Sequence, residues 1–354
     1  MVFCTPLPSL LATGVYMRPT GIMKRTPLLG RNAPGVPWND QVSTAVCRGD
    51  ADEVIRLVSQ FGGVRRLREG FAIGTQNGNT FSRLCLHTGA IAVLRSVVEV
   101  APGGLTLQDC CTHHVEDPGG LSVYSNMVLH EEALGIEYPS AAAMALALEY
   151  EPAHPCLKGP LDRFEGASLH YEALKCATMG VKNTSGLARV GEWAECARLL
   201  MSVGAPIEHR SAAHRSTAAQ MLFGHRWNRD DGLPTLLTPL LHDYVRGGWV
   251  DINAPVPGGR VPLELAIVTG NGYAAAAAID LGCDLKKAVP EGYSDLIELA
   301  RDFSTVDWDG SVVPLVTEAL LRRKFREADV HTSPAHADAS PAAPTARRAQ
   351  RARI

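Results

Sequence analysis

Apolar residues recur along most of this chain at helical spacing, in short blocks that glycines separate. A block late in the chain shows the pattern most clearly, because Leu263, Ala266 and Ile267 share one face of a helix that Gly270 ends. A second helix follows over 273–281, which consists almost entirely of alanine and aliphatic residues. Two helices this short bury too little surface to be stable alone, so the pattern predicts neighbouring pairs that share one long core.

The same two-helix block recurs, with variations, from Trp38 to about Phe325. In the first block the inward positions of both helices keep helical spacing: Val42, Ala45, Val46, Val54, Leu57 and Val58. Between 102 and 160 the register is less clear, although 121–129 and 141–150 can each form a helix. The pattern as a whole predicts an all-α solenoid.

The block between 259 and 284 also carries a specific set of residues: Gly259, Pro262, Leu263, Ala266, Gly270, Gly282 and Asp284. This set resembles the ankyrin repeat, whose signature is G-x-T-P-L-H-x-A-A-x-x-G followed by a second helix and G-A-D. Val261 stands here in place of the capping threonine. The resemblance implies a helical solenoid of about six to seven ankyrin-like repeats with short hairpin loops. Ankyrin arrays generally bind proteins, so it also implies a protein partner on the concave face.

The spacing of the blocks leaves two architectures open. Their starts lie roughly 33 to 47 residues apart, whereas the ankyrin repeat has about 33 residues. Either loops are inserted within ankyrin units, or the middle of the chain is a helical solenoid of the HEAT type. The glycine turns recur, as do the hairpin starts Gly204-Ala205 and Asp251-Ile252-Asn253, and they favour insertions.

Composition divides the chain into a disordered leader over 1–37, the array over 38–327 and a disordered tail over 328–354. The leader contains six prolines, four basic residues and no acidic residue, with no periodicity that could bury a face. Such a leader resembles the unstructured export signals of bacterial type III effectors; a secretory signal peptide or a misassigned start codon would explain the same residues. The tail is rich in alanine, proline and arginine, which is typical of unstructured chain.

Charge and cysteine content limit the class of partner and the cellular compartment that the sequence indicates. The formal net charge is −3, which gives no indication of a nucleic acid or a membrane surface as partner. No run of about 18 apolar residues indicates a membrane span. Cys85, Cys196 and Cys283 stand where the repeat places small buried residues, and buried free thiols indicate a reducing compartment. The sequence therefore predicts a cytoplasmic protein, or one that is secreted into the cytosol of a host cell.

No motif indicates catalysis. The chain has no phosphate-binding loop, dinucleotide fingerprint or nucleophile elbow. The segment Cys110-Cys111-Thr112-His113-His114 is rich in metal-binding side chains, but adjacent residues do not give the spacing that tetrahedral zinc requires. The sequence therefore predicts a non-enzymatic monomer without a cofactor or metal. The alternative is an enzyme with its site in the irregular region 102–190.

Arginine and tryptophan gather around the loops of the fourth and fifth blocks, and both residue types dominate binding hot spots. The residues predicted to bind a partner with an acidic surface are Trp193, Arg215, Arg226, Trp227 and Arg229. The alternative is that both indoles pack into the core between repeats. Two biological contexts remain open: a bacterial effector delivered into host cells, or a resident cytosolic immunity or regulatory protein that sequesters its partner.

Overall fold

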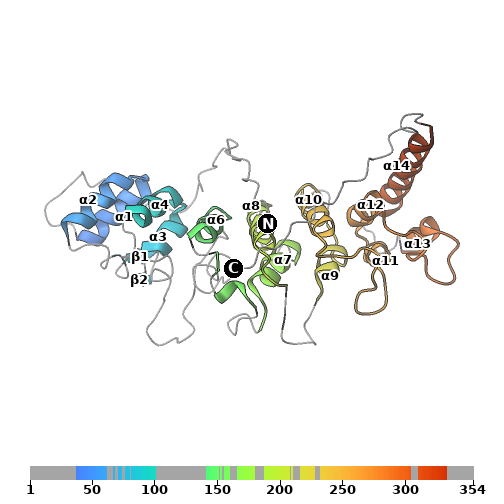
Figure 1. Cartoon of the computed structure of the whole chain (residues 1–354), viewed down its shortest axis with the longest axis horizontal. Helices are drawn as coiled ribbons and strands as arrows, with labels where there is room; N and C mark the ends of the chain where they lie inside the picture. Colours follow the sequence, from blue (N-terminus) through green and yellow to red (C-terminus); the bar gives the residue numbers. More distant parts are fainter. Residues whose placement is uncertain are drawn as a thin grey trace, which may run out of the picture.

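The computed structural model shows two rows of helices along an elongated molecule (Figure 1). It describes residues 37–61, 67, 71–73, 76–79, 81–100, 141–150, 152–153, 155–159, 166–179, 187–207, 209, 216–227, 232–303 and 310–332. The predicted leader up to residue 36, the segment 101–140 and the tail from 333 lie outside the described residues.

The helices occur in pairs whose members take different rows. The first helices are α1 (Trp38–Arg48), α3 (Phe81–Thr88), α7 (Leu169–Met179), α9 (Ala218–Phe223), α11 (Pro262–Val268) and α13 (Leu296–Asp302). The second helices are α2 (Ala51–Gln60), α4 (Ile91–Val100), α6 (Ala141–Tyr150), α8 (Leu187–Ser202), α10 (Leu233–Arg246), α12 (Gly272–Asp280) and α14 (Val312–Thr332). Figure 1 shows the second helices along the upper side and, from α3 to α13, the first helices below them.

Contacts between neighbours hold each row together. Every second helix contacts the next one from α2 to α14, and first helices contact one another from α1 to α3 and from α7 to α13. Within the described ranges, seven second helices share one row, which agrees with the predicted six to seven repeats. The first helix expected at 121–129, before α6, lies outside the described residues. The structure therefore confirms the predicted all-α solenoid.

Two features differ from the expectation. A short antiparallel hairpin of β1 (Phe71–Ile73) and β2 (Gln76–Asn79) lies between α2 and α3, and a 3-10 turn, η3 (Pro155–Leu157), follows α6. Helix α14 also continues beyond residue 327, where the array was expected to end. The residues that follow, Ala328-Asp329-Val330, contain no glycine or proline that would stop a helix.

Glycine followed by a capping side chain explains the tight turn within a pair. Gly49 ends α1 with φ 71° and Gly270 follows α11 with φ 77°, a left-handed conformation that glycine adopts without strain. Asp50 then caps α2 by accepting from the backbone N–H of Glu53 at 3.0 Å, and Asn271 caps α12 in the same way. The turn therefore satisfies backbone groups at both helix ends.

A continuous core of buried apolar side chains runs through the array from Val42 to Ala319. In α12 all five residues from Ala274 to Ala278 are buried, and small side chains let this helix lie close to its neighbours. Gly272 makes the closest approach, because a Cβ added there would lie 2.9 Å from the Cα of Val312 at the start of α14. The alanine-rich second helix thus serves the packing of the last two repeats.

Candidate interaction surface

The two tryptophans predicted to contact a partner are buried. Trp193 in α8 and Trp227 after α9 each expose 1 % of their surface, so neither can contact a partner in this conformation. The prediction for these two side chains is corrected for a physical reason. Helix α8 packs against α6, α7 and α10, which leaves its inward face no access to solvent. The alternative, in which both indoles fill the core between repeats, describes their positions.

Of the three arginines predicted to bind a partner, the structure describes one. Arg226 is half-buried in the segment that follows α9, while Arg215 and Arg229 lie outside the described residues. The backbone beside Arg226 is held in place, because the amide of Asn271 in the next repeat donates to the carbonyl of His225 at 2.5 Å. The structure therefore brings Arg226 next to an inter-repeat contact.

A buried polar group that the sequence did not reveal joins the fourth and fifth repeats. The hydroxyl of Ser168 accepts from the backbone N–H of Tyr171 at 3.1 Å, and so caps α7, and it donates to the carbonyl of Pro206 at 2.7 Å. His170 is fully buried, with Nδ1 2.6 Å from the carbonyl of Ala205 and Nε2 2.5 Å from the hydroxyl of Tyr244 in α10. The carbonyl only accepts, so Nδ1 carries the proton and Nε2 accepts from Tyr244.

This arrangement favours ankyrin-like units over a helical solenoid of the HEAT type. Ser168-Leu169-His170 occupies the place of T-P-L-H in the ankyrin signature, and its side chains bind the hairpin start that follows Gly204 in the same repeat. The helix pairs and the left-handed glycine turns recur along the array as the ankyrin pattern requires. The described residues therefore form a solenoid of ankyrin-like helix pairs.

Comparisons with known proteins add likenesses to solved ankyrin-repeat structures. The human ASB11 ankyrin repeat domain matches with 15% identity and a TM-score of 0.39, over 78% of this chain and 96% of that domain. An ankyrin repeat protein from Leishmania major matches with 11% identity and a TM-score of 0.24, over 80% and 98%. Both TM-scores are low, so the fold assignment rests on the helix pairs and contacts described above. No family model matches the chain. No curated protein matches it.

Burial lowers the pKa of His170 to about 4, because the interior disfavours the charged imidazolium, and the bond to Ala205 opposes this shift only in part. The unfolded chain, with a histidine pKa of about 6.5, binds more protons than the folded chain between these two values. We expect the free energy of unfolding to fall by about 3 kcal/mol as the pH is lowered from 6.5 to 4.

Urea unfolding measured across this pH range tests that expectation. A His170→Gln variant is the control, because it lacks the titrating ring, and its stability should fall less steeply over the same window. Equal slopes for the two proteins would contradict a neutral, buried His170.

Loops between neighbouring repeats contact one another in the second half of the array. We call the segments 203–207, 251–261 and 282–295 the loop surface. The side-chain oxygen of Asn253 accepts from the backbone N–H of Asp284 at 2.7 Å, which ties one loop to the next. Gln220 in α9 donates to the carbonyl of Pro257 at 3.2 Å. The loops 251–261 and 282–295 therefore lie side by side.

Charged side chains on the second helices are paired across repeats. These contacts are the bidentate pair of Arg95 with Glu149, the pair of Arg198 with Asp243, and the bond from the backbone N–H of Ala141 to Glu192. They join α4 to α6, α6 to α8 and α8 to α10. Single exposed pairs contribute only about 0–1 kcal/mol each, so their main effect is to fix how neighbouring helices align.

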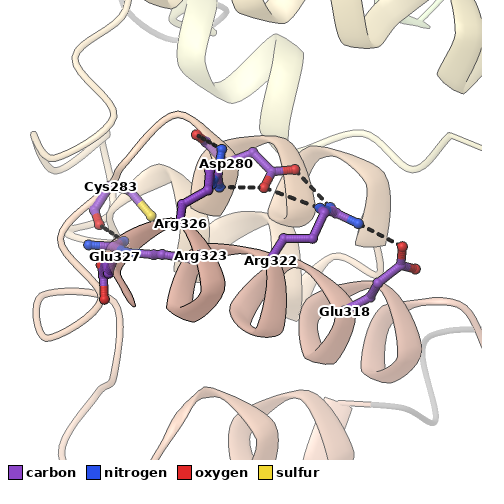
Figure 2. A network of polar contacts seen from close by, with 7 residues as sticks. All are labelled: Asp280, Cys283, Glu318, Arg322, Arg323, Arg326 and Glu327. Atoms are coloured by element: carbon purple, nitrogen blue, oxygen red, sulfur yellow. Dashed lines mark hydrogen bonds and ion pairs between the residues drawn. The ribbon is translucent and has the colours of Figure 1, made fainter. Parts of the chain in front are cut away.

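The last repeat is held by the cluster of arginines in Figure 2. Asp280 at the end of α12 accepts from Arg322 at 2.7 Å and from Arg326 at 2.8 Å, both in α14. Arg323 donates to the carbonyl of Cys283 at 2.7 Å. Three cations thus lie at the C-terminal end of α12, where the helix dipole and unpaired carbonyls favour positive charge.

The cysteines agree with the prediction of buried thiols. Cys85, Cys196 and Cys283 are free and buried, and burial raises the pKa of the Cys283 thiol to about 11. Within the described ranges no group of three or more histidine, cysteine or acidic side chains could hold a metal ion, and the segment Cys110–His114 lies outside them. None of the helices described is long and apolar enough to span a membrane.

Proposed function

We propose that this chain is a protein-interaction scaffold that binds a protein partner across the loop surface, with Lys286 and Lys287 against acidic side chains of the partner. The observation that carries the proposal is the exposure of these two lysines. In the part of the chain that the structure describes they make no ion pair.

Lys286 and Lys287 can pair with acidic side chains of a partner, and the exposed carboxylates of Asp251, Asp284 and Glu291 on the same surface can pair with basic ones, so that the two signs together fix its orientation. Side-by-side loops also offer a partner several repeats at once, as solenoids do in general. Arg226 and, outside the described residues, Arg215 and Arg229 stay proposed contacts, because all three fall in the segments that flank α9. Trp193 and Trp227 are buried in the core and are not part of the proposed contact surface.

A matched pair of charge reversals tests the proposal. Proteins captured by the wild-type chain are identified by mass spectrometry, and their affinities are then compared between Lys287→Glu and Lys324→Glu. Both lysines are exposed, but Lys324 lies on α14. We expect Lys287→Glu to weaken binding by about tenfold, through loss of one favourable and gain of one unfavourable charge contact. Equal affinities for the two variants would refute binding at the loop surface.

The acid-poor leader supports a narrower proposal, in which the scaffold is a bacterial effector that acts in host cells. The alternative is a resident cytosolic immunity or regulatory protein. Deleting residues 1–30 and measuring translocation separates the two. The effector proposal requires that delivery is lost, and it fails if delivery is unaffected or if the protein is never secreted.

A further inference from the structure

The loop 282–295, which carries the two exposed lysines of the loop surface, is tied to other elements from two sides. On one side, the side-chain oxygen of Asn253, in the loop of the preceding repeat, accepts from the backbone N–H of Asp284 at 2.7 Å. On the other side, Arg323 of α14 donates to the backbone carbonyl of Cys283 at 2.7 Å (Figure 2). Two consecutive residues of the loop are therefore held by partners that lie 31 and 40 positions away in the sequence.

This anchorage extends to the backbone of the lysines themselves. The carboxylate of Asp284 accepts from the backbone N–H of Lys286 at 3.0 Å, in a turn where an aspartate fixes the backbone two residues further along. Cys283 before the lysines and Ala288 after them are both buried, with 1% and 0% of their surface exposed. The backbone N–H of Ala288 also donates to the carbonyl of Leu285 at 3.3 Å. The two lysine side chains therefore extend into solvent from a backbone that is held on both sides.

Arg323 can fix the loop because its own position is fixed. Its Nε donates to Glu327, one turn further along α14, at 2.9 Å, while its Nη1 donates to Cys283. Its side chain is 25% exposed, compared with 43% for Arg322 and 54% for Arg326, so it is the most buried of the three arginines in the cluster. A hydrogen bond from a charged guanidinium is stronger than one between neutral groups. Helix α14 thus holds the loop with a charged donor that is itself oriented.

We propose that Asn253 and Arg323 are positioning residues for partner binding, which act through the backbone of 283–286 on Lys286 and Lys287. The proposal rests on the proposed function, because neither positioning residue is assigned a contact with the partner. A loop that is ordered before binding loses less conformational freedom when its side chains contact a partner, so ordering the loop raises affinity. Helix α14 therefore contributes to binding, although the loop surface does not include it.

NMR relaxation of the free full-length chain tests the positioning without a partner. We expect the backbone amides of Asp284 and Lys286 to have order parameters of about 0.85 in the wild type, as in rigid backbone. Asn253→Ala and Arg323→Ala should each lower these values to about 0.6, because each variant removes one tie of the loop. Asn253→Asp keeps an accepting oxygen, and Lys324→Ala changes the exposed neighbour of Arg323, so both should match the wild type. Values below about 0.6 in the wild type, or unchanged values in both alanine variants, would overturn the proposal.

A double-mutant cycle links the positioning to binding. The probe is the protein that the wild-type chain captures and that mass spectrometry identifies. We expect Asn253→Ala and Arg323→Ala each to weaken its affinity about fivefold, but by less than about twofold when Lys287→Glu is already present, because the loop then no longer provides the favourable contact. A general loss of stability would weaken binding equally in both backgrounds. Circular dichroism checks that each variant is folded.

The outcomes separate this proposal from the proposed function. If Lys287→Glu weakens binding but neither alanine variant does, the positioning role is refuted and binding at the loop surface stands. Effects of the alanine variants that simply add to that of Lys287→Glu would also refute the positioning role. If the wild-type chain captures no protein, or if Lys287→Glu binds like the wild type, the proposed function fails, and the positioning role in binding fails with it.

Discussion

The variant Trp193→Ala is expected to lose about 3–5 kcal/mol of unfolding free energy, the range for a large aromatic side chain deleted from a core. Trp193 is 1 % exposed and belongs to a core that neighbouring repeats share, so the cavity would open between α8 and the helices packed on it. Chemical denaturation followed by circular dichroism measures the loss.

Phe325→Ala is the matched control, because it also truncates an aromatic side chain on a second helix, but at a residue that is 69% exposed. Its stability should stay within about 0.5 kcal/mol of the wild type. A Trp193→Ala protein that is as stable as Phe325→Ala would show that the indole is not part of the core. The prediction also means that partner binding cannot be tested by truncating Trp193, since any loss would reflect the fold.

The variant Asn271→Ala should lose about 2–4 kcal/mol, because one side chain performs two tasks. The Asn271 oxygen caps α12 by accepting from the backbone N–H of Ala274 at 3.1 Å, and its amide donates to the carbonyl of His225 across the repeat boundary. The side chain is fully buried, so alanine would leave that carbonyl without its partner.

Asp295→Ala separates the two tasks. Asp295 caps α13 by accepting from the backbone N–H groups of Ile297 and Glu298, but it is exposed and, among the described residues, makes no hydrogen bond or ion pair to another repeat. Its loss should lower the unfolding free energy by only about 1 kcal/mol, as for an ordinary helix cap. Denaturation curves for both variants give the difference, which is the contribution of the bond between repeats. Equal losses would contradict a role for Asn271 in joining repeats.

The sequence predicted the fold well wherever glycine, proline and a capping side chain mark the helix ends. Pro262, Gly270, Asn271 and Gly282 stand at the boundaries of α11 and α12 as expected, and Val261 caps α11 without a side-chain bond. These residues act locally, so their effects can be read from the chain. The hairpin β1–β2 was missed because β2 is Gln-Asn-Gly-Asn, which lacks the β-branched and aromatic residues that mark a strand.

The candidate site was harder to predict because its residues depend on distant parts of the chain. Helix α9 has only six residues, which define no clear apolar face. The pattern therefore did not decide whether the side chain of Trp227, which follows this helix, is buried or exposed. His170 contacts Tyr244, which lies 74 positions away in the sequence, and no residue near His170 in the sequence indicates that partner. The pairing of charges on the second helices likewise appears only when the repeats are stacked.

The nearest-neighbour contacts of the two helix rows have a mechanical consequence. Since the main contacts among the described helices run between neighbouring pairs, a small rotation at one boundary need not disturb the packing at the next, and such rotations add along the array. The curvature of the solenoid can therefore adjust to the shape of a bound partner. At the C-terminal end of the array, the ion pairs of Asp280 with Arg322 and Arg326 of α14 add a polar tie to the packing of the last two repeats.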